Sequence, residues 1–332
     1  MQTLTWGVLS TAAIGLRSVI PGMQRSEHCR VLAIASRDDV RARAAAEELG
    51  LARAYDSYEA LLMDPDIDAI YNPLPNHLHV PWTVRAAECG KHVLCEKPLA
   101  LTAAEAQTLL EVRDRTGVTI QEAFMVRTHP QWLAVRELVS SGELGDLRAV
   151  QGFFSYYNSD PADIRNIADF GGGGMLDIGC YPVTTTRFVT GREPTRVIAT
   201  LDRDPVTGVD RLGSAVLDFP GMQASFAYGT QTFAYQRMTF VGTTGRVEVE
   251  IPFNAPSDRP CRLFLYRDAA PTAAPEVIEI PACDQYTLAA DAFAGAVLTG
   301  APAPVSLEDS VQNMRVLDAL VRSAEDGAWQ VM

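Results

Sequence analysis

The chain has 332 residues, of which 47% are hydrophobic and 21% charged. Such a chain can bury a large core and divides most naturally into two domains. Its 41 acidic residues outnumber 28 basic ones, so the formal net charge is -13 and the protein's field repels nucleic-acid phosphates and anionic membranes. The composition therefore argues against nucleic-acid and membrane partners and favours a small-molecule partner.

The sequence carries no pattern typical of secretion, membrane insertion or metal binding. It opens on a strand-like run without a basic leader, and no apolar stretch approaches the roughly 20 residues that span a bilayer. Its six cysteines form no CxxC pair, and His77 and His79 lack nearby acidic or thiol ligands. We expect a cytoplasmic protein with reduced thiols and no metal.

Short apolar runs alternate with helical patterns from residue 3 to about residue 121. The strand candidates are residues 4–9, 31–35, 69–71, 92–95 and 118–121. The helix candidates are residues 40–49, 58–63, 81–88 and 103–115. Capping boxes are expected at Asp56-x-x-Glu59 and Thr102-x-x-Glu105. This alternation predicts an α/β domain with a doubly wound parallel sheet.

The pattern changes after Glu122. Helices are expected at residues 131–140 and, after the glycine run 171–174, at residues 175–189. Residues 193–280 have the pattern of successive strands with Gly, Pro and Asp turns, and helices at 286–298 and 307–324 close the chain. We predict a dinucleotide-binding domain at 1–122 and an α+β domain with a mainly antiparallel sheet at 123–332.

The turn between the first strand and the first helix is placed where a dinucleotide pyrophosphate would rest on helix N-terminal amides. In register with G-x-G-x-x-G, the chain has Ser10, Ala12 and Gly15, so small residues replace two glycines. The alternative is a tight turn with no ligand. The cofactor candidates of this turn are Ser10, Thr11, Ala12 and Ile14.

The second strand ends in Ser36 and Arg37, where an NAD site usually places an acidic residue on the ribose 2′-hydroxyl. A hydroxyl and a guanidinium match a 2′-phosphate, so the sequence favours NADP(H) over NAD(H). The alternative is a solvated Arg37, with Asp38 or Asp39 reaching the ribose instead.

Several later motifs carry a family resemblance that spans nearly the whole chain. They are Pro73-Leu74-Pro75-Asn76-His77-Leu78-His79, Glu96-Lys97-Pro98, Glu122-Ala123-Phe124-Met125, Gly172–Gly174 and Asp177-Ile178-Gly179-Cys180-Tyr181. With them the sequence resembles the glucose–fructose oxidoreductase / inositol dehydrogenase / rhizopine catabolism (Gfo/Idh/MocA) family. Within it, the sequence is most similar to the branch with dimeric dihydrodiol dehydrogenase and NADP-dependent D-xylose dehydrogenase.

The resemblance implies a Rossmann domain followed by an α/β domain whose large open sheet forms a homodimer or homotetramer interface. It also implies further cofactor contacts. With the turn residues and Ser36 and Arg37, these are Leu74, Asn76, His79, Glu96 and Lys97. For Asn76, helix capping is an equal alternative, and for Glu96 the alternative is an ion pair with a basic neighbour.

Hydride transfer at a hydroxyl or carbonyl carbon needs one acid/base and one group that stabilises oxyanion character. We assign Tyr181 as acid/base, Lys97 as its electrostatic partner and Asp177 as substrate orienter, because Asp177 and Tyr181 are four residues apart on an expected helix. A core role for Tyr181 is the alternative. The other substrate candidates are Arg127, His129, Arg165 and Asn166, and for Arg165 and Asn166 a solvated loop is an equal alternative.

These residues predict an NADP(H)-dependent oxidoreductase acting on a sugar, polyol or related cyclic alcohol or ketone. One rival is a ketoreductase for a nucleotide-linked deoxysugar, and another is an NADP(H)-binding sensor without turnover. The sequence does not decide the substrate, the direction, the choice between dimer and tetramer, or whether the Lys97-Pro98 bond is cis.

Overall fold

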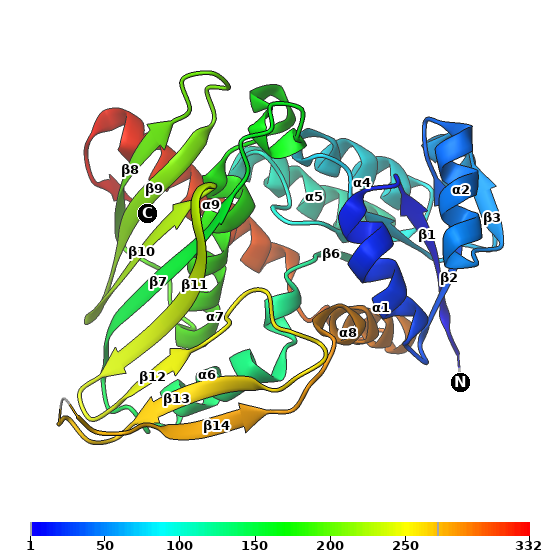
Figure 1. Cartoon of the computed structure of the whole chain (residues 1–332). Coiled ribbons are helices and arrows are strands. Elements are labelled where there is room, and N and C mark those ends of the chain that lie inside the picture. The colour runs from blue at the N-terminus through cyan, green and yellow to red at the C-terminus, as the bar shows by residue number, and fades with distance from the viewer. Residues whose placement is uncertain (1, 271) are drawn as a thin grey trace. The chain divides into compact units, whose positions relative to one another are not determined.

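The computed structural model describes residues 2–270 and 272–332, which form two compact units (Figure 1). The first unit holds the chain up to Thr128 together with Asp284–Gln312. The second holds His129–Cys283 and Asn313–Met332. The predicted domain boundary at residue 122 lies near Thr128, where the chain first passes from the first unit to the second. The sequence did not predict that residues 284–312 return to the first unit.

The first unit is built on a six-stranded parallel sheet. Its strands are β1 (Leu4–Leu9), β2 (Cys29–Ala35), β3 (Arg53–Tyr55), β4 (Ala69–Asn72), β5 (His92–Cys95) and β6 (Ile120–Glu122). They lie in the order β3-β2-β1-β4-β5-β6, which is the order of a complete Rossmann sheet. The strand order reverses between β1 and β4, and ligands of such sheets bind at this point, beyond the carboxyl ends of the strands.

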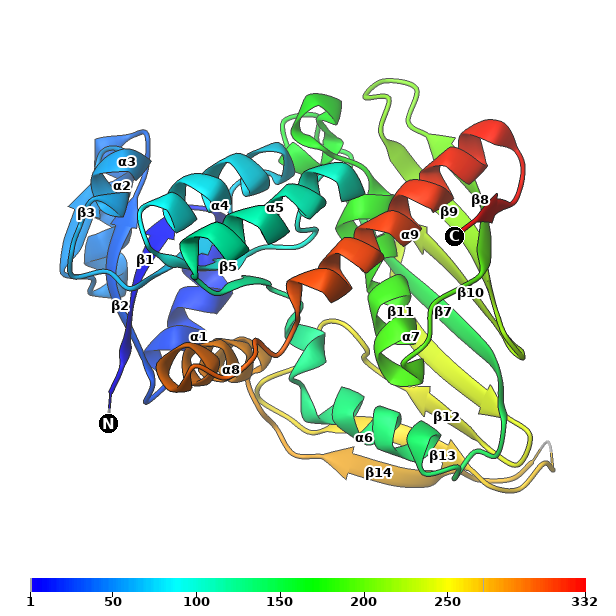
Figure 2. The same ribbon diagram turned by 180° about the vertical axis from the view of Figure 1, so that it is seen from behind.

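Helices cover both faces of this sheet. They are α1 (Ile20–Gln24), α2 (Asp39–Leu49), α3 (Tyr58–Leu62), α4 (His79–Glu88), α5 (Ala103–Thr116) and α8 (Gln285–Thr299). Helices α1 and α8 lie on one face and α4 and α5 on the other (Figures 1 and 2). The doubly wound α/β prediction is confirmed.

Helix α8 packs closely on α1, which explains why residues 284–312 belong to the first unit. A Cβ atom on Gly22 of α1 would lie 2.9 Å from the Cβ of Tyr286, so glycine permits the close approach. Thr287 donates its hydroxyl to the Gly22 carbonyl at 2.8 Å. Phe293 of α8 is buried against Trp6 of β1, with ring centroids 5.3 Å apart.

The capping signals are only partly as predicted. Thr102 caps α5 by accepting a hydrogen bond from the Glu105 amide at 3.2 Å, as expected. Helix α3 is capped by Ser57 and not by Asp56, since the Ser57 hydroxyl accepts from the Ala60 amide at 3.4 Å. The prediction for Asp56 is therefore wrong by one residue.

The second unit contains a nine-stranded sheet. Its strands are β7 (Leu147–Tyr157), β8 (Arg196–Arg203), β9 (Asp210–Phe219), β10 (Met222–Gly229), β11 (Gln231–Gly242), β12 (Arg246–Val249), β13 (Cys261–Tyr266), β14 (Glu276–Ile280) and β15 (Gln330–Val331). Their order is β14-β13-β12-β11-β7-β10-β9-β8-β15, and all pairs are antiparallel except β7 with β10. The mainly antiparallel second sheet is confirmed.

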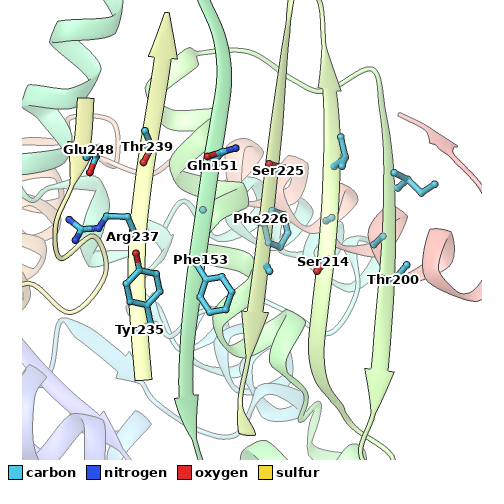
Figure 3. A pocket seen from close by; sticks show the side chains of 16 residues that line it. Gln151, Phe153, Thr200, Ser214, Ser225, Phe226, Tyr235, Arg237, Thr239 and Glu248 are labelled. Atoms are coloured by element: carbon cyan, nitrogen blue, oxygen red, sulfur yellow. The ribbon is translucent and has the colours of Figure 1, made fainter. Parts of the chain in front are cut away.

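The helices of this unit include α6 (Pro130–Ser140) and α7 (Cys180–Thr190), and α9 (Leu307–Asp326) enters the unit at Asn313. Side chains along β11 alternate in exposure: Met238 and Phe240 are fully buried, whereas Arg237 and Thr239 lie on the opposite face. The sheet therefore has one core face and one open face (Figure 3). Among the described residues, no helix combines the length and apolarity that a membrane span requires.

Candidate active site

The turn after β1 is shaped by Ser10, which has a positive φ of 75°. Non-glycine residues rarely adopt this conformation. Two hydrogen bonds hold it: the Ser10 amide donates to the Ala35 carbonyl at 2.9 Å, and the Ser10 hydroxyl accepts from the Ala12 amide at 3.3 Å. Ser10 thus makes the turn for which the glycine fingerprint uses its first glycine.

Beyond this turn, Thr11, Ala12 and Ile14 lead into a short π-helical turn at Gly15–Val19. A Cβ atom on Gly15 would lie 3.6 Å from the Tyr71 ring and 3.7 Å from Pro73, which is ordinary contact. The turn is therefore seated against the end of β4, and its partly exposed residues are available for a pyrophosphate.

The end of β2 shows how the acidic residues near Arg37 are used. Asp38 caps α2, accepting from the amides of Val40 and Arg41 at 3.0 and 3.2 Å. Asp39 pairs with Arg43 at 2.8 Å on the same helix. Both carboxylates are engaged by α2 itself, which counts against the alternative that one of them binds a ribose.

Ser36 and Arg37 remain at the edge of the sheet. Ser36 is buried, and its hydroxyl accepts from the Asp38 amide at 3.2 Å. Arg37 is exposed and lies near the phenol of Tyr58, whose pKa is raised by burial and lowered in part by the guanidinium. A cation next to two hydroxyl groups fits a 2′-phosphate.

The loops after β4 and β5 meet around Glu96. The Tyr71 hydroxyl donates to one oxygen of Glu96 at 2.7 Å, and the Lys97 amide donates to the other at 3.3 Å. Tyr286, on α8, lies near Glu96 and Lys97, and burial raises its pKa to about 12. No sequence pattern selects Tyr71 and Tyr286, because they come from a buried strand and from a distant helix.

The remaining cofactor candidates lie on the same loops. The Lys97-Pro98 peptide bond is cis. Leu74 is buried, and Asn76 opens a short 3₁₀ turn whose N-cap is Pro75, so Asn76 is not the N-cap. His79 is 1% exposed, and its two ring nitrogens each lie 2.7 Å from a backbone carbonyl oxygen, so they are not available to a cofactor in this conformation.

The atoms around the glycine run before Asp177 leave no room for side chains at these positions. Cβ atoms at Gly172, Gly173 and Gly174 would lie 2.5 Å from the Arg165 carbonyl, 2.1 Å from an Asp210 oxygen and 2.5 Å from the Tyr228 ring. Asp210 accepts from the Met175 amide at 2.6 Å and from the Tyr228 hydroxyl, which fixes the start of the helix.

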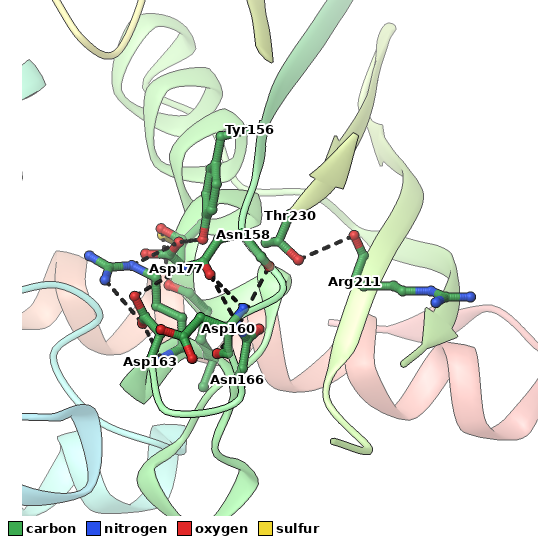
Figure 4. Close-up of polar contacts among 11 residues, drawn as sticks. Tyr156, Asn158, Asp160, Asp163, Asn166, Asp177, Arg211 and Thr230 are labelled. Atoms are coloured by element: carbon green, nitrogen blue, oxygen red, sulfur yellow. Dashed lines mark hydrogen bonds and ion pairs between the residues drawn. The ribbon is translucent and has the colours of Figure 1, made fainter. Parts of the chain in front are cut away.

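Asp177 lies in a π-helical turn, Met175–Gly179, which runs directly into α7. Its carboxylate accepts from the Tyr156 hydroxyl at 2.5 Å and pairs with Arg165 at 3.4 Å (Figure 4). Arg165 also pairs with Asp163 at 3.3 Å. The structure thus brings two predicted substrate residues together and adds Tyr156, which was not predicted although it lies near the end of a strand just before the polar loop.

Asn166 holds this loop, because its side-chain amide donates to the Asp160 carbonyl at 2.8 Å and the residue is 5% exposed (Figure 4). Tyr181 is the second residue of α7 and is 4% exposed, with its ring packed beside Phe154 and Phe253 at centroid distances of 5.6 and 5.2 Å. These contacts pack the Tyr181 ring against two phenylalanine rings.

The two other substrate candidates are engaged elsewhere. Arg127 pairs with Asp309 at 2.6 Å and its side chain is 10% exposed. His129 is the N-cap of α6: its Nδ1 accepts from the Gln131 amide at 3.2 Å, and its Nε2 lies 3.3 Å from the Cys283 sulfur. Burial lowers the pKa of His129 to about 4. The structure therefore gives both residues bracing roles.

Two family models cover most of the chain. Residues 4–124 match "Oxidoreductase family, NAD-binding Rossmann fold", and residues 132–248 match "GFO/IDH/MocA C-terminal domain". The chain belongs to the Gfo/Idh/MocA oxidoreductase family. The family and the enzyme class predicted from the sequence motifs are confirmed.

Three relatives illustrate the chemistry within the Gfo/Idh/MocA family. D-xylose 1-dehydrogenase (NADP(+)) 2 of Haloferax volcanii is 42% identical over 98% of both chains. Trans-1,2-dihydrobenzene-1,2-diol dehydrogenase of Mus musculus is 32% identical over 75% of both. The crystal structure of a 3-ketoreductase from Actinomadura kijaniata, solved with NADP and TDP-benzene, has a TM-score of 0.91 at 33% identity and covers 97% of this chain and 98% of its own.

Proposed function

We propose that this Gfo/Idh/MocA protein is an NADP(H)-dependent oxidoreductase that interconverts a hydroxyl and a carbonyl group on a sugar or deoxysugar. The observation that carries the proposal is the end of β2, where Asp38 and Asp39 are engaged by α2 and Arg37 is the exposed cation. The relatives that bind or use NADP support the same cofactor.

In this proposal the turn at Ser10 and the Ser36–Arg37 pair would hold NADP(H), which when bound would supply hydride-transfer chemistry at the reacting carbon. Tyr181 takes the hydroxyl proton when the substrate is oxidised and returns it to the carbonyl oxygen when the substrate is reduced. The Lys97 ammonium favours the phenolate of Tyr181 and stabilises negative charge on the substrate oxygen. Asp177 accepts a hydrogen bond from a neighbouring hydroxyl and so orients the substrate.

A neutral sugar is the favoured substrate. Arg165 is the basic residue closest to Asp177 in the loop of the second unit, and it pairs with both Asp163 and Asp177. The diphosphate of a nucleotide-linked sugar needs cations that are not already committed. The similarity to a 3-ketoreductase solved with TDP-benzene nevertheless makes a nucleotide-linked 3-ketosugar the second candidate.

A substrate screen that follows NADPH absorbance tests the reaction. Aldoses with NADP⁺ and a dTDP-linked 3-ketosugar with NADPH are followed by NADPH absorbance, with NAD(H) in parallel. We expect aldose oxidation with NADP⁺ and at least a roughly 100-fold loss of kcat in Tyr181→Phe, with cofactor affinity retained. Turnover of the dTDP-sugar alone would select the second candidate, and tight NADP(H) binding without turnover would select a sensor.

The cofactor assignment has its own test. Arg37→Ala removes the guanidinium, and we expect the NADP(H) dissociation constant to rise by about 10-fold or more, while NAD(H) binding is little changed. A wild-type protein that prefers NAD(H) would overturn the assignment. Arg41→Ala is the matched control, because Arg41 lies on the neighbouring α2 and only its backbone amide takes part in the cap, as a donor to Asp38.

We also propose that the open face of the second sheet is the interface of a homo-oligomer. It carries a groove of about 870 Å³ (Figure 3). The groove is lined by polar and aromatic side chains that include Gln151, Phe153, Ser214, Ser225, Tyr235 and Arg237. Arg237 also lines this groove, and its guanidinium offers a cation to an acidic side chain of a second copy of the chain.

A further inference from the structure

A single peptide group that follows Lys97 is held by two buried side chains. This group joins Pro98 to Leu99. Its carbonyl oxygen lies 2.7 Å from Nδ1 of His79, and its N–H donates to Oε1 of Glu122 at 2.8 Å. His79 and Glu122 are each 1% exposed, and neither takes part in the proposed reaction.

The two side chains come from the strands on either side of β5. His79 begins the helix that follows β4, and Glu122 is the last residue of β6. Nε2 of His79 also lies 2.7 Å from the Leu74 carbonyl, so the imidazole lies between the loops after β4 and β5. The peptide after β5 is therefore held from both neighbouring strands.

We propose that His79 and Glu122 are positioning residues that fix the Pro98–Leu99 peptide group and thereby the direction in which Lys97 leaves the end of β5. This inference rests on the proposed role of Lys97. A peptide group with a donor at its oxygen and an acceptor at its N–H has both of its hydrogen-bonding groups satisfied and a fixed plane.

Glu122 makes this hold depend on pH. Burial raises its pKa to about 7, and Asp309 acts in the same direction, whereas Ser310, the Leu99 amide and Arg127 oppose the rise. The buried thiol of Cys95 also lies nearby. An ionised carboxylate accepts a stronger hydrogen bond from the Leu99 amide than a neutral carboxyl does. The hold on the peptide therefore tightens as the pH rises through about 7.

His79 does not share this titration. Burial lowers its pKa to about 4; its two carbonyl contacts oppose that shift, and the positive charges of Lys97 and His77 add to it. The ring is uncharged near neutral pH, and a neutral imidazole donates through one nitrogen only. The proposal therefore requires the tautomer with its proton on Nδ1, which donates to the Pro98 carbonyl, while Nε2 faces the Leu74 carbonyl without a proton.

The first test measures the Leu99 amide, which belongs to the proposed fixed peptide group, by NMR. Protein labelled with ¹⁵N-leucine is titrated from acidic to mildly alkaline pH, and the Leu99 amide resonance is assigned by its loss in Leu99→Met. We expect a shift of this resonance with a midpoint near the Glu122 pKa of about 7, which disappears in Glu122→Gln. A Leu99 amide that does not titrate in this range would overturn the inference.

The second test measures kcat of variants at His79 and Glu122. Because the hold on the peptide tightens, we expect the kcat of the wild type to rise as the pH passes about 7. Glu122→Gln keeps an acceptor for the Leu99 amide but cannot ionise, so this rise should flatten in the variant. Glu122→Leu and His79→Leu each remove one contact, and we expect kcat to fall about 10-fold or more with a cofactor KM changed less than about 3-fold. His92→Gln, at the opposite end of β5, is the matched control and should leave kcat unchanged.

The outcomes separate this inference from the proposed function. If Lys97→Ala leaves kcat unchanged, the role of Lys97 is wrong, whereas the Leu99 titration tests the hold on the peptide independently. An unchanged kcat profile in Glu122→Gln overturns the positioning role even if Lys97→Ala is inactive. Should Glu122→Leu not fold, Glu122→Gln carries the test alone.

Discussion

Ser10 performs a task that glycine usually performs, and two hydrogen bonds compensate for its conformation. A β-branched side chain at φ 75° meets the backbone more severely and lacks the hydroxyl. We expect Ser10→Val to lower the free energy of unfolding by about 1–3 kcal/mol and to weaken NADP(H) binding. Urea unfolding and cofactor titration check this.

Ser10→Gly is the control for that prediction. Glycine accepts the positive φ without steric strain but loses the hydrogen bond to the Ala12 amide and gains freedom in the unfolded chain. These effects oppose each other, so its stability should lie within about 1 kcal/mol of wild type. Equal losses in both variants would show that the conformation of Ser10 is not what matters.

Buried Glu122 sets a second prediction at the residue scale. Its folded-state pKa of about 7 lies above its ordinary value of 4.5, so between these values the folded protein keeps a proton that the unfolded chain releases. Stability therefore falls as the pH rises from about 4.5 to about 7. Glu122→Gln removes this loss.

We expect the stability of Glu122→Gln relative to wild type to increase over that range by about 2–4 kcal/mol and then to level off. Urea unfolding at several pH values on both sides of this range measures the difference. Glu111→Gln, at an exposed carboxylate of α5, is the control. A difference that does not depend on pH would contradict the assignment of the titration to Glu122.

At the scale of elements, the glycine run is a packing requirement. Gly173 has a φ of 122°, and a Cβ atom there would lie 2.1 Å from the Asp210 carboxylate that holds the Met175 amide. We expect Gly173→Ala to cost about 3 kcal/mol or more, because both the backbone and Asp210 must shift. Thermal or urea unfolding, with kcat measured in parallel, checks this.

Gly208 is the matched control in the same unit. Its φ of 75° is also positive, but a methyl group there would have no neighbouring atom within 4 Å, so Gly208→Ala should cost only the conformational penalty of about 1–2 kcal/mol. Similar losses at the two glycines would mean that contact with Asp210 contributes little. Activity should fall in Gly173→Ala and persist in Gly208→Ala.

The local sequence pattern predicted most helices and strands. It failed where contacts with distant parts of the chain determine the structure. The apolar runs of β1, β4 and β5 and the helical patterns of α2 and α5 were predictable, because their periodicity is set by burial within the sheet. Strand β3 is only three residues, Arg53–Tyr55, and pairs with β2 at the edge of the sheet, so it leaves too short a signal. The place of α8 depends on its contact with Gly22.

The candidate site was predictable to a similar degree. Asp177 and Arg165 were both selected and do meet, since short motifs and polar loops reveal such residues. His129 and Asn166 were selected as substrate contacts, but one caps a helix and the other braces a loop. The sequence holds no sign of these bonds, because their partners are backbone groups of the folded loop and helix.

For the whole molecule, the open sheet face leads to an expected assembly. Ser225 lies on that face, on β10 near the middle of the sheet (Figure 3). We expect Ser225→Glu to place a charge in the interface between copies and to reduce the mass in solution towards the 36.1 kDa of one chain. Size-exclusion chromatography with light scattering measures it.

Val40→Glu, at a side chain that is 75% exposed on α2, is the control and should leave the assembly unchanged. A wild-type protein of 36.1 kDa in solution would refute the interface directly. A variant that keeps the wild-type mass would place the interface elsewhere on the surface.

The bonds around Asp177 bear on which substrates the protein can select. One oxygen of this carboxylate is held by both Tyr156 and Arg165, so the residue is already solvated by its own protein. In the proposed reaction, an incoming substrate hydroxyl competes with these internal ligands for the carboxylate. An alcohol that offers a single poorly aligned hydroxyl gains little from that exchange, whereas a polyol that also bonds Arg165 or Tyr156 recovers what it displaces. We therefore expect the protein to prefer substrates with several neighbouring hydroxyl groups over simple alcohols, if Asp177 orients the substrate as proposed.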